Sequence, residues 1–408
     1  MLSNELKLIK KNNCYLKKSL FVLINKYNDL IDKEKIFNIG YTSYIKDKHG
    51  KDRLVYSARI GKSMVTTWYN TEMTRICDIS NNKIINDKQL IVHNNICHNL
   101  SLFNYTNNDT NNIIGYGGVY AKSRNSKNQE GIFSLNFKND SITNIKVTIP
   151  KNISAKTNFE TAFDSNICCL KYNNKFYVYS RYNQGVGIRK TQLFVSDKFD
   201  SGFKFKSIIK FNDTSIYTYM QTIFIENDIF IGIFRTYRKK NLNFHAIHNS
   251  DTTISYIISH SFDGINFVID SENFIPNFES NDLISNNYKK RKDKKSFFFS
   301  NMGMPPKNTN IIKEYEIRDG GYVYYENETN SDESNIYLQV LNNKNTILLN
   351  YTINENGYIN IYFLDEDKKE ISKKKVLIKD NTNNIIDLPE NSKFLNIKFK
   401  KSKIYQIL

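Results

Sequence analysis

Apolar and polar residues alternate along most of this chain in short runs. Residues 53–59 (RLVYSAR), 175–181 (KFYVYSR) and 229–235 (IFIGIFR) are examples, and segments rich in Asn, Asp and Lys separate such runs. Alternation with a period of two is typical of strands that bury one face, whereas helices require a longer 3.6-residue period. The pattern therefore predicts an all-β protein.

A turn phrase recurs where these runs end. It stands at residues 259–267 (SHSFDGINF) and, in a looser form, at residues 196–203 (SDKFDSGF). Ser, Asp and Gly are residues of hairpin turns, and each copy ends on an aromatic residue that can anchor the next strand. Strand units repeated at intervals of several tens of residues indicate a β-propeller. Roughly five four-stranded blades fit between residues 36 and 320.

The texture of the sequence changes after residues 319–321 (DGG). Four later segments carry clean strand patterns between polar turns: 336–340, 346–351, 358–364 and 394–399. Short antiparallel strands in a segment of this size are typical of a β-sandwich. We therefore predict an N-terminal segment over 1–35 that is a candidate to complete the propeller, a five-bladed propeller over 36–318, and a β-sandwich over 319–408.

Charge narrows the range of partners. The formal net charge is +17, which on its own would allow a nucleic-acid partner. However, the sequence contains no motif that reads RNA or DNA, and its densest basic run, 289–295 (KKRKDKK), is predicted to be a solvated loop. We therefore expect no nucleic-acid partner and attribute the charge to lysines on solvated faces.

Cysteine usage and hydropathy predict a soluble protein without bound cofactors. The 5 cysteines include the adjacent pair Cys168 and Cys169, and they form neither a CxxC motif nor a Cys/His cluster. This argues against a disulfide framework and against a metal site. The apolar run 19–24 (SLFVLI) is too short for a signal peptide, and no run approaches a membrane span. We expect a cytoplasmic protein or one associated with a virion or another assembly, of undetermined oligomeric state.

Several segments match, in the same order, a known family. They span about 300 residues: 94–103 (NNICHNLSLF), 117–118 (GG), 163–166 (FDSN), 179–181 (YSR), 217–221 (YTYMQ), 234–237 (FRTY), 261–267 (SFDGINF), 318–323 (RDGGYV) and 393–406 (KFLNIKFKKSKIYQ). The chain thereby resembles the glycoside-hydrolase-like five-bladed β-propellers with a C-terminal β-sandwich. These are relatives of the invertase and arabinanase propellers, known largely as uncharacterised bacterial proteins.

The resemblance implies a carbohydrate ligand in the central funnel, where the inner strands of a propeller present polar residues. Seven residues become candidates for substrate binding: His98, Asn99, Arg181, Arg189, Gln221, Arg235 and Asn301. Arg181 and Arg235 could hold the carboxylate or sulfate of an anionic sugar, because a guanidinium binds such groups with paired hydrogen bonds. The alternative for these two arginines is a structural ion pair, for example with Asp164.

Glycosidic hydrolysis needs two carboxyl groups, roughly 5 Å apart for retention and about 6.5–9.5 Å apart for inversion. Asp164 is the candidate nucleophile or base, and Glu72 and Glu160 are candidates for the second carboxyl group. The Asn-Asp-Pro, Arg-Asp-Pro and Glu-Cys signatures of invertase-type hydrolases are absent, and the fifth blade is short in sequence after residues 297–306 (FFFSNMGMPP). Three functions stay open: hydrolysis of O-glycosyl bonds, glycan binding without catalysis, and a structural role.

Overall fold

The computed structural model confirms the all-β prediction. It describes residues 6–12, 14–19, 21–27, 36–60, 72–90, 99–107, 110–118, 131–155, 163, 165–185, 188–238, 253–272, 275, 282–301, 311–327, 333–341, 344–377 and 379–408. Strands dominate these residues, and no helix among them is long and apolar enough to cross a membrane. Two compact units are formed, one by residues 21–291 and 295–316 and the other by residues 1–20, 292–294 and 317–408.

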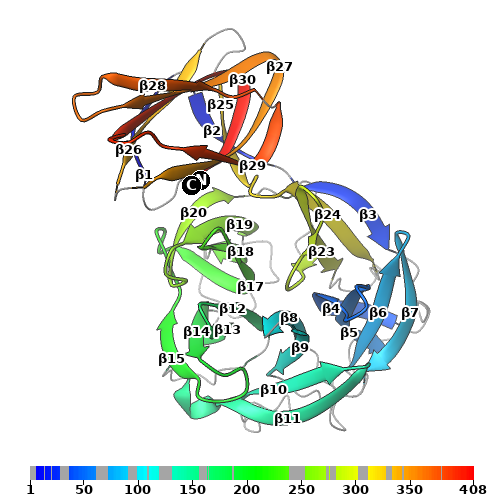
Figure 1. Ribbon diagram of the computed structural model, residues 1–408. Coiled ribbons are helices and arrows are strands. Elements are labelled where there is room, and N and C mark those ends of the chain that lie inside the picture. Colours follow the sequence, from blue (N-terminus) through cyan, green and yellow to red (C-terminus); the bar gives the residue numbers. More distant parts are fainter. Residues whose placement is uncertain are drawn as a thin grey trace. The chain divides into compact units, whose positions relative to one another are not determined.

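The larger unit is a five-bladed β-propeller, with its five antiparallel sheets arranged in a ring (Figure 1). The first blade contains β4 (Ile36–Lys46), β5 (Asp52–Ile60), β6 (Glu72–Ser80) and β7 (Lys83–Leu90). The second contains β8 (Ser101–Asn107), β9 (Thr110–Gly117), β10 (Gly131–Lys138) and β11 (Ser141–Pro150). The third contains β12 (Cys168–Tyr172), β13 (Lys175–Gly185), β14 (Ile188–Ser196) and β15 (Lys204–Ile208). The fourth contains β17 (Ile216–Glu226), β18 (Ile229–Arg238), β19 (Thr253–Ser261) and β20 (Asn266–Glu272), with β16 (Lys210–Phe211) parallel to β20.

The fifth blade joins strands from two distant parts of the sequence. Its later strands are β21 (Asp282–Ile284), β22 (Lys289–Lys290), β23 (Lys294–Asn301) and β24 (Ile312–Arg318). Its outermost strand is β3 (Val22–Tyr27), which pairs antiparallel with β24. The blade is short in the local sequence because this strand comes from near the N-terminus, and the ring is closed by hydrogen bonds between the two chain regions.

Asparagine builds the hairpin turns of the blades. Four turns have two successive residues with positive φ: Asn81–Asn82, Asn139–Asp140, Asn173–Asn174 and Asn227–Asp228. Two positive φ angles are the requirement of a type I′ turn, which matches the twist of the strands that it joins. Asn and Asp adopt this left-handed conformation more readily than other residues with a side chain, so the blades turn without glycine at these positions.

The phrase at residues 259–267 is the turn between β19 and β20. One carboxylate oxygen of Asp263 accepts the N–H groups of Ile265 and Asn266, both at 2.8 Å, and Gly264 has a φ of 72°. Burial raises the pKa of Asp263, but these hydrogen bonds outweigh it and bring the pKa to about 2. Phe267 is buried in the core of the blade. The phrase therefore shapes a hairpin and anchors its second strand.

The basic run at residues 289–295 differs from the solvated loop that the sequence predicts. Parts of it belong to β22 and β23, and Lys295 is 1% exposed, with its ammonium 2.5 Å from the carboxylate of Glu226. Lys289 forms an ion pair with Asp52. The loop prediction is wrong at these positions because the carboxylates that neutralise the lysines come from neighbouring blades, which a local charge pattern does not reveal.

The smaller unit is a β-sandwich. Its strands are β1 (Leu6–Asn12), β2 (Cys14–Lys18), β25 (Val323–Asn327), β26 (Ser334–Val340), β27 (Thr346–Leu364), β28 (Glu370–Lys375), β29 (Asp380–Asp387) and β30 (Phe394–Ile407). The register between the long strands β27 and β30 breaks between Ile353 and Tyr358. One half of each strand therefore belongs to one layer of the sandwich, and the other half belongs to the other layer. The first layer runs β1-β26-β30-β27-β28 and the second runs β2-β25-β30-β27-β29. Apolar side chains from both layers form one core.

Candidate functional site

Three of the candidate residues, Glu72, Arg189 and Asn301, lie at the same end of their blades. The inner strands β4, β8, β12, β17 and β21 contact one another in a closed ring. At the end where these strands begin, Glu72 pairs with Arg59 in the first blade and Arg189 pairs with Asn183 in the third. Asn301 pairs with Asp282, the first residue of β21, in the fifth. The register thus brings segments far apart in the sequence to a common end of the propeller.

The carboxyl groups expected to act in hydrolysis are not among the described side chains. Asp164, Glu160 and His98 lie outside the described residues. Glu72 begins β6 and Asn301 ends β23, but only their backbones belong to the described part of the chain. Their predicted roles in catalysis and substrate binding stay predictions.

Asn99 holds the backbone on both sides of residue 164. Its buried amide nitrogen donates to the carbonyl oxygens of Phe163 at 2.5 Å and Ser165 at 3.1 Å, and its oxygen accepts the N–H of Gly118. A Cβ at Gly118 would lie 2.5 Å from the Phe163 carbonyl oxygen, which explains the glycine at this position. Ser165 has a φ of 146°, a conformation that residues with a side chain rarely adopt. The backbone around Asp164 is therefore constrained and strained.

Gln221 links the third and fourth blades. Its amide nitrogen donates to the carbonyl oxygens of Asn166 at 3.1 Å and Tyr179 at 3.4 Å. Its amide oxygen accepts the hydroxyl of Thr191 at 2.9 Å. Both ends of this side chain, which is 1% exposed, thus take part in the contact between blades.

Three arginines gather around two tyrosines at the boundary of the third and fourth blades. The guanidinium carbons of Arg235 and Arg189 lie 4.6 and 5.0 Å from the centre of the Tyr219 ring. The Tyr237 hydroxyl accepts the backbone N–H of Arg189 at 2.9 Å. Burial raises the pKa of Tyr237 to about 12, although the Arg189 N–H and the charges of Arg189 and Arg181 lower it. Positive charge is therefore concentrated where Arg181, Arg189 and Arg235 meet.

The two tyrosines were not among the residues expected to bind a ligand. Tyr219 and Tyr237 are buried, and both stand inside segments that carry the family resemblance, 217–221 and 234–237. Each tyrosine stands two residues from a candidate residue, Tyr219 from Gln221 and Tyr237 from Arg235. This spacing could have indicated that the tyrosines lie near the candidate residues. What the sequence does not show is that Arg189, from another blade, contacts the Tyr219 ring.

Asparagines near the axis join the blades beside this end. The Asn166 amide donates to the carbonyl oxygens of Thr42 at 3.3 Å and Ile284 at 3.1 Å, which belong to the first and fifth blades. Asn286 makes comparable bonds to Ser101 and Ile167. These amides are fully buried, so they fix the inner strands rather than present polar groups to solvent.

Two other features bear on the chemistry. Among the residues with described side chains, no three His, Cys, Asp or Glu groups are placed to hold a metal ion. A groove of about 830 Å³ lies between the first and second blades, next to the turn 47–51 and the hairpin of β10 and β11. Arg53 lines this groove and forms ion pairs with Asp78 and Asp140. This groove is at the opposite end of the strands from the arginines, as the register of β4 and β5 shows.

No protein-family model and no curated protein matches this sequence. Among solved structures, a family 117 glycoside hydrolase from Zobellia galactanivorans is similar, with 11% identity, a TM-score of 0.49 and coverage of 76% of this chain and 93% of that chain. A GH32 β-fructofuranosidase from Bombyx mori has 9% identity, a TM-score of 0.42 and coverage of 95% and 93%. A protein of unknown function from Dyadobacter fermentans has 10% identity, a TM-score of 0.47 and coverage of 95% and 99%. At such low values these similarities do not identify a ligand of this chain.

Proposed function

We propose that this chain is a carbohydrate-binding propeller whose ligand carries an anionic group. Arg181, Arg189 and Arg235 would hold that group at the end of the propeller where the inner strands begin. The observation that carries the proposal is the gathering of these arginines around Tyr219 and Tyr237. A guanidinium binds a carboxylate or sulfate with paired hydrogen bonds, and a tyrosine combines an apolar ring with a polar hydroxyl.

Burial strengthens this site. Arg181 is 4% exposed and Arg235 is 3% exposed, so both charges act in surroundings that screen them less than water does. The contacts with the Tyr219 ring also restrict the positions of two guanidinium groups before any ligand arrives. A restricted donor loses less freedom on binding, which favours affinity for a matching anion.

We expect Arg235→Gln to weaken binding of an anionic oligosaccharide by about 30-fold or more, because loss of a buried charged donor costs about 2 kcal/mol or more. The measurement is isothermal titration of the full chain with oligogalacturonates, sulfated galactose oligomers and neutral oligosaccharides. Arg235→Lys should recover only part of the affinity, because an ammonium lacks the paired geometry of a guanidinium. Thermal unfolding of each variant shows whether the fold is intact.

Arg238→Gln is the matched control. Arg238 lies three residues further along β18, and it forms ion pairs at 2.8 Å with Asp213 and Glu272 at the surface. Its replacement should leave oligosaccharide affinity unchanged. Equal losses from the Arg235 and Arg238 variants, or equal affinity of the wild type for neutral and anionic oligosaccharides, would contradict the proposed site.

Hydrolysis is the second candidate function, favoured by the backbone around residue 164. Asn99 fixes the carbonyl groups on both sides of Asp164, and the strained φ of Ser165 follows directly. Strained and over-determined backbone occurs preferentially at active sites. We propose Asp164 as nucleophile or base, with Glu72 or Glu160 as its carboxyl partner.

If the chain hydrolyses glycosidic bonds, Asp164→Asn should lower kcat by at least about 1,000-fold while the KM changes little, because a catalytic carboxylate acts mainly in the transition state. Of Glu72→Gln and Glu160→Gln, only the variant that removes the carboxyl partner should lower kcat comparably. The measurement is release of reducing sugar from the oligosaccharides that bind. Turnover that survives Asp164→Asn would remove this residue from the mechanism, and binding without turnover in the wild type would leave a glycan-binding protein.

A further inference from the structure

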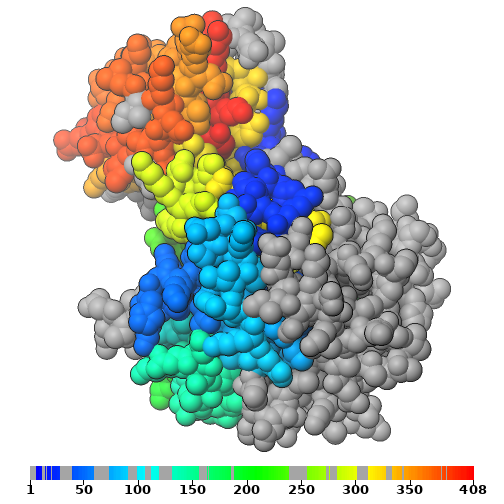
Figure 2. Space-filling model, turned by 90° about the vertical axis from the view of Figure 1, so that its right-hand side faces the viewer, coloured from blue at the N-terminus to red at the C-terminus, as the bar shows by residue number. Residues whose placement is uncertain are grey.

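The outward face of the first sandwich layer carries a row of aromatic and amide side chains. The register aligns Tyr337 of β26 with Asn396 of β30. Asn396 is aligned in turn with Tyr362 of β27, and Tyr362 with Lys373 of β28. Alternate residues such as Ile361 are buried between the layers, so the row points outward. Atoms of β27 and β28, drawn in orange, lie on the surface of this unit in Figure 2.

Aromatic and basic groups are adjacent on this face. The rings of Phe394 and Tyr337 are stacked, with centroids 5.8 Å apart and an angle of 18° between their planes. The ammonium groups of Lys373 and Lys398 lie 4.8 and 5.3 Å from the centre of the Tyr362 ring. Lys398 also lies 3.3 Å from a carboxylate oxygen of Glu333. The face is therefore aromatic and positively charged, with an acidic group beside it.

A second row runs parallel to the first and adds amides. Asn335 is aligned with Lys398, Lys398 with Asn360, and Asn360 with Lys375. We refer to the two rows as the aromatic–amide face, defined by Asn335, Tyr337, Asn360, Tyr362, Phe394 and Asn396. All six residues are partly exposed.

Two polar atoms of this face have no hydrogen-bond partner among the described residues. They are the hydroxyl oxygen of Tyr337 and the amide oxygen of Asn396, and both are inaccessible to water. Desolvation raises the pKa of Tyr337, so its hydroxyl is a neutral donor and acceptor at ordinary pH. Such groups cost stability unless they are paired. Because the protein itself covers both atoms, a ligand on this face meets the rings, the lysines and the partly exposed amides of Asn335 and Asn360.

We propose that the aromatic–amide face binds an extended anionic polysaccharide that lies across the strands. Neighbouring strands are about 4.8 Å apart, so Tyr337 and Tyr362, two strands apart, are separated by about 10 Å. That distance is comparable to two sugar units of an extended chain. The rings contact sugar faces, the amides bind hydroxyl groups, and Lys373 and Lys398 attract carboxylate or sulfate groups. The proposal takes its class of ligand from the proposed function, but its site lies on a different unit.

A single-stranded nucleic acid could also use rings and lysines. The amides of Asn335, Asn360 and Asn396 favour the polysaccharide, because their donors and acceptors suit a ligand covered with hydroxyl groups. Nucleic acid is therefore an outcome for the experiment to exclude.

The test measures binding of the full chain to immobilised polygalacturonate, dextran and poly(U) at about 150 mM salt, where long-range attraction to the basic chain is screened. We expect binding to polygalacturonate only. Tyr337→Ala and Tyr362→Ala, which keep the charge, should each weaken it about tenfold, a loss of about 1.4 kcal/mol. Tyr324→Ala is the matched control, because Tyr324 lies on the other layer and has a similar lysine contact, 4.7 Å from Lys403. The Tyr324→Ala variant should bind polygalacturonate as tightly as the wild type does.

Arg235→Gln separates this proposal from the proposed function. It should weaken binding of short anionic oligosaccharides in solution by about 30-fold or more and leave binding to polygalacturonate within about twofold. The Tyr337→Ala, Tyr362→Ala double variant should lose binding to polygalacturonate. Unchanged polymer binding in that double variant would overturn the aromatic–amide face. Absence of polymer binding in the wild type, or retention on poly(U) equal to that on polygalacturonate, would overturn it as well.

Discussion

Replacing Asn286 by alanine should destabilise the propeller by about 3 kcal/mol, since removal of one donor leaves buried acceptors unsatisfied and opens a cavity. The Asn286 amide donates to the Ser101 hydroxyl and the Ile167 carbonyl oxygen, both at 2.9 Å. Its backbone binds the first blade through Thr42 and Tyr44. One fully buried residue of the fifth blade thus contacts the first, second and third. The measurement is urea unfolding followed by far-UV circular dichroism.

The matched control for Asn286 is Asn104→Ala. The Asn104 side chain also joins two blades, with bonds of 2.6 and 2.8 Å to the backbone of Lys46, but it is exposed. Water can replace those bonds, so we expect a loss below about 1 kcal/mol. Similar midpoints for the Asn286 and Asn104 variants would show that the axial amide does not hold the blades together.

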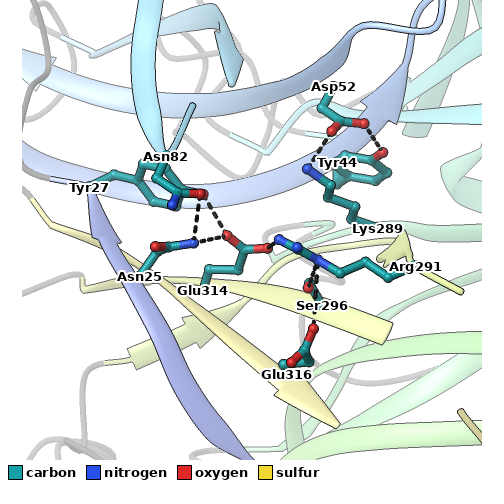
Figure 3. A network of polar contacts seen from close by, with 10 residues as sticks. All are labelled: Asn25, Tyr27, Tyr44, Asp52, Asn82, Lys289, Arg291, Ser296, Glu314 and Glu316. Carbon is teal, nitrogen blue, oxygen red and sulfur yellow. Dashed lines mark hydrogen bonds and ion pairs between the residues drawn. The ribbon is translucent and has the colours of Figure 1, made fainter. Parts of the chain in front are cut away.

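Replacing Glu314 by alanine should cost about 3 kcal/mol as well, because it breaks the buried network that closes the ring. Glu314 of β24 is 0% exposed, and it accepts from Tyr27 at 2.5 Å and Asn25 at 2.8 Å, both on β3. Arg291 donates to its other oxygen at 3.1 Å (Figure 3). Without the carboxylate, the phenol and the guanidinium lose their shared acceptor, and β3 is held by fewer bonds. Urea unfolding measures this loss too.

Low pH should weaken the stabilisation that the Glu314 network gives to the pairing of β24 with β3. Burial raises the pKa of Glu314, but hydrogen bonds from Tyr27, Asn25, Ser296 and Arg291 outweigh it and leave the pKa below its ordinary value. The stabilisation is therefore complete above about pH 5 and is lost as the pH falls through about 4 and below, where the folded carboxylate takes up its proton. Glu314→Gln should show a smaller loss of stability between pH 6 and pH 3 than the wild type.

Asn82→Gly provides the reference for the closure. Asn82, in the turn between β6 and β7, accepts a 3.2 Å bond from Asn25 at an exposed position. Its φ is 59°, and glycine keeps this turn conformation while it removes the bond. We therefore expect the replacement to change stability by less than about 0.5 kcal/mol. If Glu314→Ala were no less stable than Asn82→Gly, or if Glu314→Gln had the same pH dependence as the wild type, the network would not be what closes the propeller.

Part of the candidate site could be predicted from the sequence. Arg181, Arg189 and Arg235 stand in or beside segments that recur in a known family. The structure brings Arg189 and Arg235 to the Tyr219 ring and the charge of Arg181 close to Tyr237. The contacts of Gln221 could not be predicted, because its partners lie just before β12, on β13 and on β14, and depend on how two blades pack. A glutamine side chain can bind an exposed ligand or join two buried strands with the same amide group. Only its burial in the structure shows which of these two roles it has.

The sequence by itself determined the local structure of this protein. Alternation along each run specifies strands, and Asn pairs such as Asn173–Asn174 specify their turns, because both depend on neighbouring residues alone. The tertiary structure decided which strands are partners: β3 with β24 across the propeller sequence, and Lys295 with Glu226 across two blades. Such pairings depend on the packing of segments that are far apart in the chain. For the same reason, only the structure shows the arginine cluster and the aligned rows of the aromatic–amide face.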